Sequence, residues 1–338
     1  MLQKLFVASS YLISLGIALF LFLLGSASSK PFYQNAEIAP KSGFSEIAKM
    51  LSDKKIIRSQ NAFLLYGIIS GSAHQLKPGN YFLSSGSTTP EILRVIVKGP
   101  AVDKEITFPE GVTLKDIEAF LSGAGILPKG SLVNFDFKKI AGDYEFLKGR
   151  KNFEGFLFPD TYRFFLNSNT EQVVKKFLDN FQQKAWPLLR ECKVQSEKCK
   201  EFDTKEILTI ASLLEKEVPD FQDRKIISGI IYKRLELGIA LHIDATITYA
   251  KCSGAFLTCA EPKVFRKDLT FQSLYNTYLY NGLPPGPIGN PGLEAIKAAL
   301  NPIQSEYLYY LSDPKTKKTI FSETLEEHIE NRAKYLGI

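Results

Sequence analysis

The longest apolar stretch of the chain lies near its start, where residues 5–27 contain no charged side chain. As a helix, these 23 residues would be roughly 35 Å long, enough to cross a hydrocarbon core of about 30 Å. We therefore expect residues 1–30 to form a single-pass membrane anchor. A cleaved signal peptide is the alternative, because Gly25, Ser26 and Ala27 are small enough for a signal peptidase. Both interpretations place the rest of the chain outside the cytoplasmic membrane.

Residues 31–42 are polar and contain two prolines, a pattern typical of a tether. After them, apolar residues recur at helical spacing from Phe44, and a turn at 77–80 leads into a short strand. We expect residues 43–100 to form one small module. Strand–helix–helix–strand units of this kind resemble LysM modules, which bind the N-acetylated sugars of cell-wall glycans. A compact spacer without binding activity is the alternative.

From residue 101 to residue 338, strands and helices follow one another without an obvious linker, so we expect one larger domain there. Its elements are segregated rather than strictly alternating, which predicts an α+β fold. Asp203 and Glu206 have the spacing of a capping box, and they predict the start of a helix.

The helix that starts near Asp203 is predicted to have one apolar side. Glu215 lies at the edge of that side, and Glu217 lies about 160° away from it around the helix axis. Lys216, between them, is expected to point to solvent. The apolar side consists of Ile207, Ile210, Ala211, Leu214 and Val218.

The position of Glu215 at an apolar border has a chemical consequence. A carboxyl group there loses solvation, and this favours the protonated form that a general acid needs. The alternative is a glutamate at a helix edge that simply pairs with a nearby lysine. The spacing alone does not decide between the two.

Composition narrows the possible functions only slightly. The chain is 45% hydrophobic and 23% charged, which argues against a disordered protein. Its net charge of +6 would suit an anionic polymer or membrane surface, but many enzymes of neutral ligands have the same balance. We find no nucleotide, flavin or phosphate-loop fingerprint in the sequence. We therefore expect no cofactor, no nucleic-acid partner and no metal, since His242 and His328 lack a third ligand.

The four cysteines form two local pairs, Cys192 with Cys199 and Cys252 with Cys259. Within each pair the residues are seven apart, which predicts two small disulfides in an oxidising compartment. Zinc binding is the competing interpretation. It lacks support because neither pair has the two-residue spacing of a zinc knuckle and no histidine is adjacent.

The segment around Glu215, Ala-Ser-Leu-Leu-Glu-Lys-Glu at 211–217, resembles the active-site segment of the MltG (YceG-like) family of endolytic murein transglycosylases. Other segments resemble further motifs of that family in the same order. Ala245 departs from the pattern, because the family usually has proline there, but the change does not affect the proposed acid. The matching segments are 154–162, 231–235 with 241–249, 275–278 with 282–292, and 307–309 with 321–328.

The resemblance implies cleavage of the β-1,4 bond between N-acetylmuramic acid and N-acetylglucosamine without water. Glu215 would first protonate the leaving oxygen. It would then accept the proton of the C6 hydroxyl, which closes onto C1 as a 1,6-anhydro ring. The family association also implies a bacterial inner-membrane protein, anchored through residues 5–27, whose catalytic part is periplasmic. Its cutting would end the growth of glycan strands, with wall synthases or division proteins as partners.

Further site residues are expected in the matching segments. Asp244 has two open interpretations, a cap of the following turn or a sugar contact, and Asp160 is either a turn residue or a site residue. The run 282–287 is predicted to be a rigid loop that walls the cleft. The candidate substrate-binding residues are Asp160, Asp244, Thr246, Tyr249, Asn276, Thr277 and Tyr278.

Two other functions remain open at this point. The chain would be a membrane-tethered glycan-binding or scaffolding protein if Glu215 were structural. It would be a water-using muramidase if a second carboxylate, with Asp244 as the best candidate, faced Glu215. Anhydro ends identify a transglycosylase and reducing ends a hydrolase.

Overall fold

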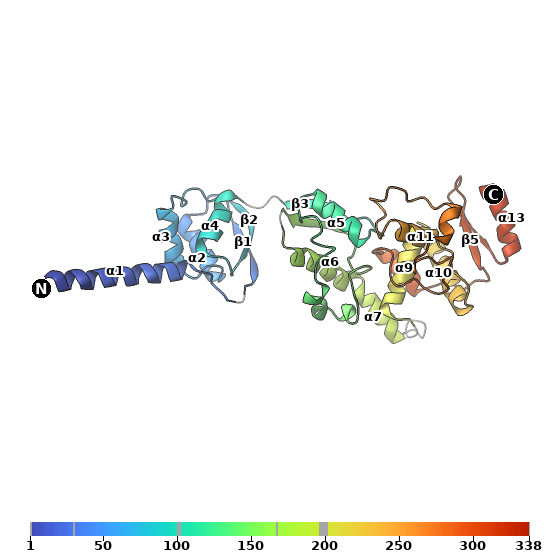
Figure 1. Cartoon of the computed structure of the whole chain (residues 1–338), viewed down its shortest axis with the longest axis horizontal. Helices are drawn as coiled ribbons and strands as arrows, with labels where there is room; N and C mark the ends of the chain where they lie inside the picture. Colours follow the sequence, from blue (N-terminus) through green and yellow to red (C-terminus); the bar gives the residue numbers. More distant parts are fainter. Residues whose placement is uncertain (1, 30, 100–102, 167, 196–201, 338) are drawn as a thin grey trace. The chain divides into compact units, whose positions relative to one another are not determined.

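The computed structural model describes residues 2–29, 31–99, 103–166, 168–195 and 202–337 (Figure 1). The chain divides into two compact units, Met1–Val102 and Asp103–Ile338. Each unit has its own apolar core, and we describe the two separately.

The first unit contains a two-stranded antiparallel sheet and four helices within its described residues. Tyr33 pairs with Ser84 at one end of the sheet, and Ile38 pairs with Gly79 at the other. Leu51, Ile56 and Phe63 are fully buried in its core. The elements are α1 (Leu2–Leu24), β1 (Tyr33–Ile38), α2 (Phe44–Asp53), α3 (Gln60–Ile69), β2 (Gly79–Ser84) and α4 (Thr89–Lys98).

The predicted tether, residues 31–42, differs from the structure because β1 lies within it. Ala36 and Ile38 are buried while the residues between and before them face outward. This alternation was masked in the sequence by the polar residues around it. The order β1, α2, α3, β2 is the strand–helix–helix–strand pattern on which the LysM-like interpretation depends, and glycan binding by this unit stays a prediction.

In the described part of the chain, no helix is both long enough and apolar enough to span a bilayer. The membrane anchor at residues 5–27 stays a prediction.

The second unit mixes helices with short antiparallel strand pairs, and the α+β prediction is confirmed. Strand β3 pairs with β4, and β5 pairs with β6. The elements are β3 (Asp103–Thr107), α5 (Leu114–Gly123), the short 3₁₀ helices Phe137–Lys139, Ala141–Asp143 and Glu145–Leu147, β4 (Thr161–Phe165), α6 (Thr170–Lys184), α7 (Trp186–Gln195), α9 (Thr204–Glu217), α10 (Phe221–Glu236), α11 (Asp244–Lys251), the 3₁₀ helix Arg266–Thr270, α12 (Leu293–Leu300), β5 (Tyr309–Ser312), β6 (Thr319–Ser322) and α13 (Leu325–Leu336).

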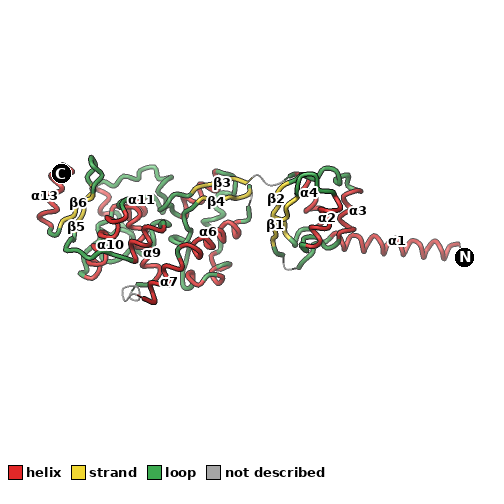
Figure 2. The backbone as a smooth tube through the Cα atoms, turned by 180° about the vertical axis from the view of Figure 1, so that it is seen from behind, coloured by secondary structure: helices red, strands yellow, loops and turns green. Residues whose placement is uncertain are grey.

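Helices α10, α11 and α12 pack against α9. Figure 2 shows α9 between the labelled helices of this unit, beside α10 and α11. The predicted capping box is confirmed, since the Asp203 carboxylate accepts from the Glu206 N–H and the Glu206 carboxylate accepts from the Asp203 N–H. The predicted single apolar side was too narrow. Thr209 and Ser212 are also buried, because the neighbouring helices cover the helix on more than one side and each hydroxyl bonds a carbonyl of the helix itself.

The disulfide prediction is confirmed for Cys252 and Cys259, whose Cα atoms lie 5.3 Å apart. Cys192 is also disulfide-bonded. Its expected partner, Cys199, lies outside the described residues.

Candidate active site

The Glu215 carboxylate lies near the C-terminal end of α9, and both of its oxygens are bonded. The Arg224 guanidinium donates to Oε1 at 2.7 Å, and the backbone N–H of Gly292 donates to Oε2 at 2.9 Å. The Glu215 side chain is only 5% exposed and that of Arg224 only 7%. Both oxygens of the nearly buried carboxylate therefore have hydrogen-bond donors in place of the water that burial removes.

Arg224 comes from α10, which returns beside α9 after a short turn. Asp220 caps that helix by accepting from the backbone N–H groups of Gln222 and Asp223. A second bond fixes the guanidinium, because its Nε donates to the Val218 carbonyl at 2.7 Å. Arg224 is thus tied both to the end of α9 and to the carboxylate that α9 presents.

The segment 288–292 runs beside α9 and brings Gly292 to Glu215. Its start is fixed by Ser212, whose hydroxyl accepts from the Ile288 N–H at 3.0 Å. At Gly292, an added Cβ would lie 1.8 Å from a carboxylate oxygen of Glu110. A side chain at Gly292 would therefore force the Glu110 carboxylate to move from this position.

A turn at Pro109–Gly111 also lies next to Glu215. Gly111 has a φ of 76°, and a Cβ there would lie 2.9 Å from the Lys216 ammonium and 3.1 Å from Glu215 Cγ. The prediction that Lys216 points to solvent is wrong. Its ammonium lies 4.3 Å from the centre of the Phe256 ring, and burial lowers the pKa of Lys216.

A buried polar network supports this turn from below. The Asn290 amide oxygen accepts from the Gly155 and Leu157 N–H groups, while its nitrogen donates to the Val112 carbonyl and to Glu154. Glu154 also accepts from the Leu114 N–H and, at 3.3 Å, from the Tyr249 hydroxyl. Tyr249 was predicted to bind substrate. In the structure its hydroxyl instead bonds Glu154, which belongs to the network below the site.

Glu154 should give the folding stability a measurable pH dependence. Burial raises its pKa from 4.5 to about 8 in the folded protein. Between these values the folded protein binds a proton that the unfolded chain has lost, so stability falls as the pH rises. We expect Glu154→Gln, which cannot ionise, to lack this component, worth at most about 1.4 kcal/mol per pH unit.

Denaturant unfolding of the parent and of Glu154→Gln at several pH values between about 5 and 8 measures this component as the difference between the two. The free energy of unfolding of the variant, relative to that of the parent, should grow with pH. A constant difference across the range would mean that Glu154 is ionised throughout.

Asp244 and Tyr278 meet at the surface, where the Tyr278 hydroxyl donates to the Asp244 carboxylate at 2.7 Å. The Tyr278 ring also stacks on His242, with ring centres 4.7 Å apart. Asp244 is in the first turn of α11, while the N-cap position belongs to Ile243, so Asp244 is not the cap. An exposed carboxylate beside a stacked aromatic ring is a surface that suits a sugar.

Glu217 does not share a site with Glu215, as its position on the helix predicts. It accepts from the Tyr310 hydroxyl at 2.7 Å, on strand β5. Burial raises the pKa of Glu217 to about 7, and the Tyr310 bond opposes that rise.

Three predicted substrate-binding residues, Thr246, Asn276 and Thr277, instead belong to the protein framework. All three are at most 1% exposed. Thr246 and Thr277 bond each other at 3.1 Å, and the Asn276 amide donates to the carbonyls of Leu269 and Phe271. These bonds fix the loop that carries Tyr278, and they leave the three side chains no access to a glycan.

Asp160 precedes β4, where its carboxylate accepts from Asn180 at 2.8 Å and pairs with Lys184. Both partners belong to α6, and within the described residues the Asp160 carboxylate bonds none of the residues around Glu215. The structure thus favours the interpretation of Asp160 as a structural turn residue.

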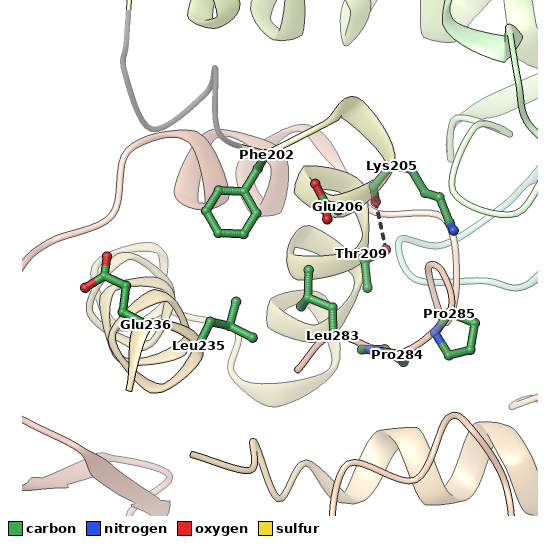
Figure 3. Close-up of a pocket in the computed structure, with 9 residues that line it drawn as sticks. All are labelled: Phe202, Lys205, Glu206, Thr209, Leu235, Glu236, Leu283, Pro284 and Pro285. Atoms are coloured by element: carbon green, nitrogen blue, oxygen red, sulfur yellow. Dashed lines mark hydrogen bonds between the residues drawn. The ribbon is translucent and has the colours of Figure 1, made fainter. Parts of the chain in front are cut away.

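A cavity of about 460 Å³ lies between the first half of α9 and the end of α10 (Figure 3). Leu283, Pro284 and Pro285 line this cavity together with Phe202 and Leu235. The run 282–287 therefore lines a cavity, but Glu215 is not part of it. Glu206, another lining residue, is nine positions before Glu215, about 14 Å along the helix.

Glu215 is the acid that the sequence predicts, whereas the three residues that surround it were not predicted. Gly292 lies in the segment 282–292, which resembles a family motif, and Glu110 lies outside the matching segments. Arg224 had no local signal, because its pairing with Glu215 depends on how α10 packs against α9.

The chain is similar to known proteins along most of its length. A model of the YceG-like family matches residues 36–334. The endolytic murein transglycosylase of Bacillus subtilis is 29% identical over 94% of this chain and 90% of its own length. That of Streptococcus pneumoniae serotype 2 is 28% identical over 92% of this chain, which spans 60% of the streptococcal protein.

The structure of a yceG-like protein from Listeria monocytogenes is also similar. It aligns with 31% sequence identity and a TM-score of 0.57, over 89% of this chain and all of the other. Since the family model covers most of the sequence, this chain belongs to the YceG-like family.

Proposed function

We propose that the protein is a peptidoglycan lytic transglycosylase that uses Glu215 as its acid and base. The observation that supports this most is the bonding of Glu215, a nearly buried carboxylate with one guanidinium and one backbone N–H as partners. In the structural alternative, a glutamate at a helix edge pairs with a lysine, and that is not the arrangement found for Glu215. The names of the related proteins support the same reaction.

In the first step, protonated Glu215 gives its proton to the oxygen that links the two sugars, and the bond from C1 to that oxygen breaks. In the second, the C6 hydroxyl oxygen of the muramic sugar bonds to C1, and the Glu215 carboxylate accepts its proton. The products together contain the same atoms as the substrate. Because the nucleophile belongs to the substrate, the reaction needs no water and only one carboxylate.

Arg224 and Gly292 would act mainly in the second step. A carboxylate attracts the guanidinium and the N–H more strongly than a carboxylic acid does, so both donors stabilise the form that accepts the C6 proton. They also hold the side chain in one place, which aligns it with the reacting atoms.

The surface formed by Asp244, Tyr278 and His242 is the best candidate for holding the glycan strand outside the reacting sugars. A carboxylate that bonds hydroxyl groups and a ring stacked at the surface provide the contacts that sugars use. Cleavage by this enzyme would end the growth of the glycan strand that it cleaves.

The uncharged residues 5–27 lead us to propose that the protein is held in the bacterial inner membrane with its catalytic unit in the periplasm. Alkaline extraction of membranes from cells that produce the full chain tests the anchor. A protein that stays in the pellet supports it, and release into the soluble fraction overturns it.

Mass spectrometry of the products from purified peptidoglycan tests the reaction. Sugars with 1,6-anhydro ends are expected. Reducing ends would show a water-using muramidase instead, and a folded protein that releases no product would point to a binding or scaffolding role.

A further inference from the structure

Glu110 is a second carboxyl group next to Glu215, and the mechanism above does not use it. It lies on the turn that joins β3 to α5, and its side chain packs directly against Gly292. Gly292 is also the residue whose N–H holds Glu215. The two carboxylates are thus on the two sides of one glycine.

The backbone holds Glu110 firmly in this position. The Gly111 N–H donates to the Asn290 carbonyl at 2.8 Å, and the Asn290 N–H donates to the Val112 carbonyl at 2.8 Å. The two bonds join the turn to the segment that contains Gly292. Gly111 itself contacts Glu215 and Lys216 too closely to allow a side chain, so the turn lies directly on the end of α9.

The two carboxylates differ in how they are bonded. Both oxygens of Glu215 have protein partners, whereas Glu110 takes part in no hydrogen bond or ion pair of the described residues. Glu110 is exposed, and its carboxylate lies against Gly292 beside the proposed acid. A carboxylate whose backbone is fixed next to the proposed acid, and whose oxygens have no protein partner, can bond a ligand without first breaking a bond within the protein.

We propose that Glu110 contacts the glycan directly, its carboxylate accepting a hydrogen bond from a hydroxyl or amide N–H of a sugar at the bond that Glu215 cleaves. This inference depends on the proposed function for the identity of the ligand. Partial burial and the charge of Glu215 raise the pKa of Glu110, whereas Arg224 lowers it, which agrees with a location inside the same electrostatic environment.

Glu110→Ala removes the contact, and Glu110→Gln keeps an acceptor oxygen but removes its charge. Hydrogen bonds to charged groups predict about a 10- to 100-fold loss of kcat/KM for Glu110→Ala and a smaller loss for Glu110→Gln. Glu294→Ala is the matched control, because Glu294 is also an exposed carboxylate near Glu110. It should change kcat/KM by less than about twofold.

If Glu110→Ala has the same thermal unfolding midpoint as the parent, its loss of activity comes from the lost contact and not from a loss of folded structure. Glu110→Ala with kcat/KM within about twofold of the parent's overturns the inference, and so does a loss that parallels a fall in thermal stability.

Binding decides the case in which the parent itself releases no product. Peptide-free glycan strands of peptidoglycan are titrated into Glu215→Gln with and without Glu110→Ala. About tenfold weaker binding of the double variant supports the contact even if the proposed reaction fails. Equal binding, or no binding to either, overturns the contact.

Discussion

Glu215→Gln should abolish the release of anhydro-ended products from peptidoglycan while leaving the protein folded. The substitution keeps the shape of the side chain, and the amide oxygen can still accept from Arg224 or from Gly292, but an NH2 group replaces the second oxygen and the amide has no acidic proton to transfer. General acid and base catalysis contributes about 100- to 10,000-fold to such reactions, and here one group performs both transfers. We expect activity to fall at least 1,000-fold, measured by mass spectrometry of the products.

Glu217→Gln is the matched control, because it makes the same change two residues along α9. Glu217 bonds Tyr310 and none of the residues around Glu215, and its amide can still accept from the Tyr310 hydroxyl. Its activity should stay within a few-fold of the parent's. Anhydro products from the Glu215 variant at the parent's rate would place the catalytic acid elsewhere.

Arg224→Met should cause the largest loss of stability among the site variants. The methionine removes one partner of a buried ion pair and leaves the Glu215 carboxylate nearly buried with a single donor. Breaking such a pair on one side costs about 3–5 kcal/mol, because the remaining charge has no compensation. Denaturant unfolding at neutral pH measures this loss, and the release of anhydro ends should fall with it.

The double variant Arg224→Met with Glu215→Gln identifies the cause of that loss. If the cost comes from an uncompensated charge, removing the carboxylate as well should restore part of the lost stability. Additive losses in the two single variants would show that Arg224 stabilises the protein by its packing and its bond to Val218 instead.

The sequence predicted the parts of the fold that depend on local signals. The start of α9 followed from Asp203 and Glu206, and Glu215 was identified because its neighbours in sequence form a recognisable segment. β1 was missed because only two of its residues are buried, in a polar stretch that contains prolines on both sides.

The candidate site was harder to predict because its parts come from distant segments. Arg224, Gly292 and Glu110 meet Glu215 only through the packing of α10, the 288–292 segment and the turn before α5. Thr246 and Thr277 failed as substrate contacts for a related reason. Their residue types suit a sugar equally well as a buried framework, and burial is decided by tertiary structure.

The Cys252–Cys259 disulfide closes a short loop that contacts Lys216, the residue next to Glu215. Within that loop, the Phe256 and Leu257 N–H groups bond the Asp116 carboxylate, and the Phe256 ring faces the Lys216 ammonium. Closing a loop of this length removes about 2–3 kcal/mol of freedom from the unfolded chain. The stability of the loop that places Phe256 against Lys216 is therefore tied to oxidation, and the fold around Glu215 would be less stable in a chain still in a reducing environment than in the same chain after its thiols have been oxidised.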